Sequence, residues 1–123
     1  MRLVMVALAA GLLTASATRA ADNSDPGFQA LDALARFYGM QFSAAQTAQN
    51  CAVNVEQQRG YFTLMEGWAG LIRGLPAEFH RPAAEGVVVA SRRYALMAPE
   101  LRCETARDDH TRQLHMWQRA HGR

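Results

Sequence analysis

The sequence predicts an all-α protein, a small bundle of four to five helices stapled by one disulfide. Apolar residues recur at helical spacing in most segments of the chain. The valine run at 87–89 favours a strand by propensity, but no other segment resembles a pairing partner. The two cysteines, Cys51 and Cys103, allow only one pairing.

The first 20 residues have the features of a secretory signal peptide. A basic Arg2 precedes an apolar run of about a dozen residues, and small side chains precede a cleavage point after Ala20. A membrane anchor is the less favoured alternative, because a spanning helix needs roughly 20 apolar residues. We expect export to the periplasm, a polar arm at 21–27 and a single helical domain at 28–121.

The charge of the predicted mature chain limits its partners. The full chain carries a formal charge of +2 and contains no lysine. Removing residues 1–20 also removes Arg2 and Arg19, which leaves arginines and acids in equal number. Nucleic acids and anionic membrane surfaces both favour positively charged proteins. We therefore expect no nucleic-acid partner and no membrane-embedded segment in the mature chain.

The cysteines suit a disulfide in an oxidising compartment. Closing the loop between Cys51 and Cys103 would restrict the unfolded chain by about 4 kcal/mol in the chain-entropy model. Two free, buried thiols are the alternative that stays open. Neither cysteine lies in a C-x-x-C or C-x-x-C-H motif, so redox-active dithiols and covalent haem are unsupported, and we expect no cofactor.

Two helices are predicted in the first half of the domain. Asp25 can cap the first helix, with Pro26 at the first helical position. Gly39 is expected to end this helix. Ser43 is expected to cap a second helix, which runs through thinly apolar sequence to about Val55.

The segment 60–74 predicts a third helix with two stripes. Large apolar side chains, Trp68 among them, gather on one face and predict burial. Gly60, Gly67, Gly70 and Gly74 form the neighbouring stripe. Each interior glycine costs a helix up to about 1 kcal/mol relative to alanine. We therefore expect another backbone to approach this stripe closely and the helix to lie at the centre of the bundle.

The last two helices are bounded by prolines and acids. Pro82 is placed to begin the fourth helix after a short connector at 76–82, and Pro99 is expected to break it. Asp108 or Asp109 is expected to cap the final helix.

Four histidines are the only candidate metal ligands of note: His80, His110, His115 and His121. Helical metal sites favour ligands three or four residues apart, whereas the three tail histidines are spaced by five and six. We expect these three to be solvated on different faces and predict no metal site. A metal-handling protein is the least favoured alternative.

The sequence also predicts no catalytic residues. Ser43 and Ser91 lack the context of a nucleophile elbow, and no phosphate-binding loop or dinucleotide fingerprint is present. Tryptophan, tyrosine and arginine, which the chain does contain, are enriched at protein interfaces. We expect a non-enzymatic binding protein, and a homodimer is also compatible with the sequence.

The middle of the chain resembles a family of small periplasmic immunity proteins that neutralise type VI secretion amidase effectors. The similar region covers about residues 51–115. Its matching residues are Cys51, Gly60-Tyr61, Glu66-Gly67, Val87-Val88, Tyr94 and Pro99-Glu100.

This resemblance implies an exported helical protein that binds a cell-wall amidase stoichiometrically and covers its catalytic cleft. Specificity would then lie in the connector 76–82, where Glu78, His80 and Arg81 are the candidate partner-binding residues. The alternative is a periplasmic acid or stress chaperone, because four histidines would add positive charge near pH 6.

Overall fold

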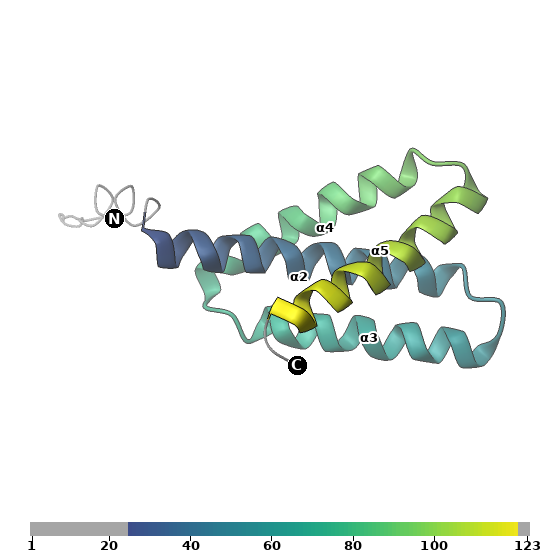
Figure 1. The fold of residues 1–123 in the computed structure, drawn as a ribbon, viewed down its shortest axis with the longest axis horizontal. Coiled ribbons are helices and arrows are strands. Elements are labelled where there is room, and N and C mark those ends of the chain that lie inside the picture. The colour runs from purple at the N-terminus through teal and green to yellow at the C-terminus, as the bar shows by residue number, and fades with distance from the viewer. Residues whose placement is uncertain (1–24, 121–123) are drawn as a thin grey trace. The chain divides into compact units, whose positions relative to one another are not determined.

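The computed structural model of the chain describes residues 25–120 and shows only helices there (Figure 1). The predicted all-α class and the helical bundle are confirmed. The predicted signal peptide at 1–20 lies outside the described residues, as does His121. The elements are α2 (Pro26–Asn50), α3 (Val55–Arg73), the short 3-10 helix η1 (Ala77–Phe79), α4 (His80–Ala95) and α5 (Pro99–Ala120).

The chain divides into two compact units, Met1–Ala33 and Leu34–Arg123. In the first unit, Asp25 caps α2 as predicted, since its Oδ2 accepts a hydrogen bond from the backbone N–H of Phe28 at 3.1 Å. In the second unit, short connections join the rest of α2, α3, α4 and α5 in sequence (Figure 1). The single domain expected at 28–121 stays a prediction.

Helix α2 is one continuous helix, so the predicted stop at Gly39 and start at Ser43 are wrong. Both residues are buried and face α4. The hydroxyls of Ser43 and Ser91 are 2.8 Å apart, so Ser43 bonds across the bundle instead of capping a helix. Local helix-breaking signals are overridden here by tertiary contacts.

Helices α2 and α4 approach each other so closely that their backbones touch. A Cβ at Gly39 would overlap the carbonyl oxygen of Ala83 and lie 2.9 Å from its carbonyl carbon. A Cβ at Gly86 would overlap the carbonyl oxygen of Arg36 and lie 3.1 Å from its Cα. Glycine is therefore needed at both positions, because the two backbones touch with no room for a side chain.

The predicted role of the α3 glycines is wrong within the described chain. A Cβ at Gly60 or Gly67 would meet nothing within 4 Å. At Gly70 it would meet only the Arg73 guanidinium, at 3.8 Å, and at Gly74 it would make ordinary contacts with carbonyl oxygens of the preceding turn. The central position that was predicted for α3 is occupied by α2, and α3 is peripheral.

Trp68 is buried, as predicted, and no other residue of α3 is buried. Its ring packs on Phe37 and Tyr38 of α2, with centroid distances of 5.8 and 5.9 Å. Large side chains therefore separate α3 from α2. By contrast, α2, α4 and α5 meet largely through alanines: Ala44, Ala48, Ala90 and Ala106, together with Tyr94.

The disulfide predicted between Cys51 and Cys103 is confirmed, with Cα atoms 5.7 Å apart. It joins the residue that follows α2 to the second turn of α5. Because the two cysteines are 52 residues apart, the bond restricts the unfolded chain by about 4 kcal/mol in the entropy model.

The predicted cap at Asp108 or Asp109 is wrong, because α5 begins two turns earlier, at Pro99. Proline is well suited to the first helical position, which needs no N–H donor. Arg102 then donates from Nε to the carbonyl of Tyr94 at 2.9 Å and from Nη2 to that of Met97 at 3.0 Å. The guanidinium thereby satisfies carbonyls at the end of α4 and holds the turn into α5.

Gln41 is a polar residue that is buried without hydrogen-bond partners in the described chain. It is 0% exposed, on the buried face of α2, and both polar atoms of its amide lack a hydrogen-bond partner in the described chain. Such groups destabilise a folded protein because they lose their bonds to water.

No helix in the described part of the chain is long and apolar enough to cross a membrane.

The α2–α4 contact can be tested by substituting Gly39 with alanine. Gly39→Ala is expected to lower the free energy of unfolding by about 1–3 kcal/mol, because the added methyl group overlaps the Ala83 carbonyl. Urea denaturation of the oxidised protein measures the change. The matched control is Gly67→Ala, which should raise stability by up to about 1 kcal/mol. Equal effects of the two substitutions would contradict the contact.

Replacing Gln41 with methionine, which has a similar shape, is expected to stabilise the protein by about 1–2 kcal/mol, because it removes two unpaired buried polar atoms. Thermal and urea unfolding would measure the gain. Gln46→Met, at an exposed position on the same helix, should change stability by no more than about 0.5 kcal/mol. A loss of stability in Gln41→Met would show that the amide is satisfied after all.

Candidate functional site

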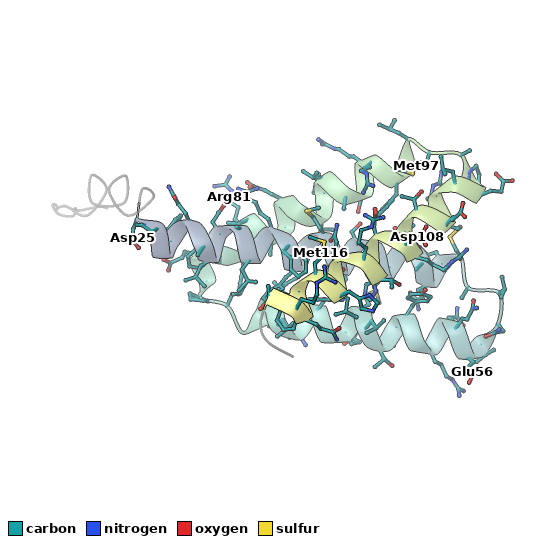
Figure 2. All side chains as sticks on the ribbon, in the orientation of Figure 1. Asp25, Glu56, Arg81, Met97, Asp108 and Met116 are labelled. Carbon is teal, nitrogen blue, oxygen red and sulfur yellow. A yellow bond between two sulfur atoms is a disulfide. The ribbon has the colours of Figure 1, made fainter. Side chains whose placement is uncertain are left out.

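One surface of the described chain combines exposed apolar side chains with several arginines. On α4, Arg81, Glu85, Val88 and Arg92 follow one another at intervals of three or four residues, so they lie in one row along the helix. Val89 lies beside this row. All five side chains are exposed, and Figure 2 shows Arg81 near the start of α4.

The close packing of α2 on α4 adds Arg36 to this row. Because Gly86 brings the backbone of Arg36 against α4, the Arg36 guanidinium reaches Glu85, with Nη2 2.8 Å from Oε1. The Arg81 Nε lies 3.9 Å from the other oxygen of Glu85. Exposed pairs of this kind contribute at most about 1 kcal/mol, so the long contact to Glu85 does not prevent Arg81 from pairing with another carboxylate.

These residues line a shallow hollow of about 420 Å³. Val88 and Val89 are 44% and 59% exposed and form its apolar part. Three arginines and one glutamate surround them. We call this the arginine–valine surface; it consists of Arg36, Arg81, Glu85, Val88, Val89 and Arg92. Arginine binds carboxylates through two parallel N–H donors, so the surface suits an acidic ligand with an apolar part.

The three predicted partner-binding residues lie in η1 and at the start of α4. Glu78 lies in η1, and His80 and Arg81 open α4; all three are exposed. The His80 Nε2 lies 3.0 Å from the carbonyl oxygen of Leu75, so the imidazole closes the turn by donating to it. Among the three, Arg81 alone belongs to the arginine–valine surface.

Sequence reasoning missed Arg36, Val88, Val89 and Arg92. The helical pattern of α4 could have indicated the last three. Val87, Ala90 and Tyr94 mark its inner face, which places Val88, Val89 and Arg92 on the outer face. Nothing in the sequence indicated Arg36, whose place depends on a contact between helices that are distant in the chain.

The histidines do not form a metal site in the described residues, which hold no group of three or more histidine, cysteine or acidic side chains placed to bind an ion. His115 is exposed, in line with the prediction. The prediction of a solvated His110 is wrong, since this residue is 3% exposed. Its Nε2 accepts a hydrogen bond from the indole Nε1–H of Trp68 at 3.2 Å.

Asp109 is the one deeply buried acid among the described residues, at 2% exposed. Its Oδ2 accepts from Arg93 Nη1 at 2.7 Å and from the Tyr94 hydroxyl at 3.1 Å, and Arg112 Nη2 lies 3.4 Å from Oδ1. Burial, reinforced by the neighbouring carboxylate, raises the pKa of Tyr94 to about 12. The hydrogen bond to Asp109 raises the pKa of Arg93. These partners occupy the carboxylate, which thereby links α4 to α5.

Comparison of the chain with protein-family models, with curated proteins and with solved structures finds no match. The class that the structure defines is a disulfide-linked helical bundle. The evidence that the arginine–valine surface is a binding site is therefore the geometry of its own residues.

The buried His110 predicts a pH dependence of stability. Burial lowers the pKa of His110, and protonation of Nε2 would remove the acceptor for Trp68. Unfolded histidine binds its proton near a pKa of about 6.5. Stability from this residue is therefore fully present above that pH and is lost as the pH falls towards the lower pKa of the folded state.

The expected slope is up to about 1.4 kcal/mol per pH unit below about pH 6.5. Urea unfolding between pH 7.5 and 5 would measure it in the wild type and in His110→Gln, whose side-chain oxygen can still accept from Trp68. The variant should lose part of the slope, whereas His115→Gln should keep it. The same pH profile in all three proteins would exclude His110 as the cause.

Proposed function

We propose that this chain is an exported, non-enzymatic binding protein that holds an acidic patch of one protein partner on its arginine–valine surface. The observation that carries the proposal is the exposure of Val88 and Val89 in the middle of three arginines. A single exposed valine is unremarkable in any protein. Two neighbouring ones with a charged rim have the apolar centre and polar edge of a protein interface.

The charge distribution favours an acidic protein partner. Arginine is enriched at interface hot spots, and its planar guanidinium pairs well with carboxylates. Glu85 lies among the arginines and would repel a dense row of phosphates, which argues against nucleic acid. Apolar contact with the two valines would add affinity that charge alone does not provide at physiological salt.

A periplasmic location is part of the proposal. It rests on the signal-like residues 1–20 and on the disulfide, which suits an oxidising compartment. The narrower hypothesis comes from the resemblance to immunity proteins: the partner would be a cell-wall amidase effector, inhibited by a one-to-one complex. Arg81 belongs both to the connector expected to hold specificity and to the arginine–valine surface.

A charge-reversal experiment tests the proposal. Arg81→Glu/Arg92→Glu places acids at both ends of the α4 row, and it should weaken binding of an acidic partner at least about tenfold. The matched control is Arg59→Glu/Arg73→Glu, which makes the same charge change at exposed positions of α3. Oxidised wild type and both variants would be used to capture periplasmic proteins and a panel of purified amidases.

The proposal predicts one stoichiometric partner that is held by wild type and control and lost by the α4 variant, with affinities measured by calorimetry. A partner that both double variants weaken equally would reflect general charge, not this surface. Inhibition of a bound amidase would support the narrower hypothesis, and binding without inhibition would refute it.

The acid chaperone is a second candidate because His110 is buried, and its protonation is expected to weaken the fold on acidification. A chaperone should expose apolar surface at pH 5 and suppress the aggregation of unrelated proteins there. Binding of a hydrophobic dye and light scattering of a denatured client measure the two properties. A chain that stays closed and inactive in both assays at pH 5 excludes this function.

A further inference from the structure

A second hollow lies between α3 and α5 and shares no residue with the arginine–valine surface. Its volume is about 320 Å³, near the lower end of the range of about 300–1,000 Å³ for small-molecule sites. The residues that matter for its chemistry are Gly60, Tyr61 and Leu64 on α3, with His110, Thr111 and Leu114 on α5.

Gly60 accounts for the open space. A Cβ at this position would have no neighbour within 4 Å, so the wall of the hollow is bare backbone on that side. An interior glycine destabilises a helix by about 1 kcal/mol relative to alanine, and no backbone in the described chain packs against Gly60 to explain it. Tyr61, Leu64 and Leu114 provide apolar surface around the gap.

His110 supplies a buried polar group on the wall of the hollow. Its ring lies between Tyr61 and Trp68, with edge-to-face contacts at centroid distances of 6.3 and 6.2 Å. Because Nε2 accepts from the Trp68 indole, the neutral imidazole carries its proton on Nδ1. The imidazole lines the hollow, so a ligand bound there can approach this N–H. A ligand with an acceptor oxygen can pair with it.

We propose that this hollow binds a small neutral ligand with an apolar body and a carbonyl oxygen. The oxygen accepts from the Nδ1–H of His110, and the body packs against Tyr61, Leu64 and Leu114. A neutral ligand is favoured because, with His110 in its neutral form, no lining side chain is charged, and a carboxylate or ammonium group would lose water without gaining a counter-charge. The volume suits a single ring or a short branched chain.

Acetophenone is a suitable probe, because it joins one aromatic ring to one carbonyl group. Ethylbenzene has a similar shape and lacks the acceptor. Two-dimensional NMR of the oxidised protein would follow the indole N–H of Trp68, whose partner His110 forms the wall of the hollow. Acetophenone is expected to shift this signal saturably, and ethylbenzene to bind about tenfold more weakly, since it cannot make the hydrogen bond.

Gly60→Leu should abolish the acetophenone shift by filling the hollow, and the space around Gly60 allows the variant to fold. Gly67→Leu is the matched control: it adds the same side chain to the same helix, also in open space, and should bind like the wild type. Thr111→Phe closes the hollow from α5 and tests it independently of the glycine. Circular dichroism would confirm the fold of each variant.

Three results would overturn the proposal: no saturable shift with acetophenone, equal affinity for ethylbenzene, or binding that survives both Gly60→Leu and Thr111→Phe. None of them bears on the arginine–valine surface, so the two proposals fail separately.

Discussion

The hydrogen bond between Trp68 and His110 is the contact on which the arrangement of three helices depends. The indole of Trp68 packs against Phe37 and Tyr38 of α2, and its N–H reaches the imidazole on α5. One side chain therefore joins α2, α3 and α5. The bond also assigns the His110 proton to Nδ1, which gives the hollow between α3 and α5 its donor. Trp68 is the one buried residue of α3, and Tyr61, Met65 and Ile72 add partly buried contacts around it.

Two kinds of packing divide the bundle. On one side, glycine and alanine let α2, α4 and α5 approach closely, and Gly39 and Gly86 bring backbone against backbone. On the other side, aromatic and long aliphatic residues hold α3 further away and leave open space beside its glycines. The close side positions the arginine–valine surface by bringing Arg36 to α4. The looser side contains the hollow beside His110. The two proposed functions thus follow from two different ways of filling a small core.

The helical class, the disulfide, the cap at Asp25 and the burial of Trp68 could be predicted because each depends on local pattern or on counting. The roles of Gly39 and Ser43 could not be predicted, since a glycine that ends a helix and a glycine that admits a neighbouring helix look alike in sequence. For the same reason, the close approach predicted at the α3 glycines was wrong. Asp109 and His110 lie in a polar stretch, and their burial depends on Arg93, Tyr94 and Trp68, far away in the chain. Of the arginine–valine surface, only Arg81 was predicted, because Arg36 joins it through a tertiary contact.

The most direct measurement of the central contact is the protonation of the His110 ring by long-range ¹H–¹⁵N NMR at pH 7.5, combined with hydrogen exchange of the Trp68 indole. We predict a neutral ring with its proton on Nδ1, an Nε2 shift typical of an unprotonated acceptor, and an indole hydrogen protected to nearly the same degree as the core amides. A ring protonated on Nε2, or an indole hydrogen that exchanges as fast as in a free peptide, would contradict it.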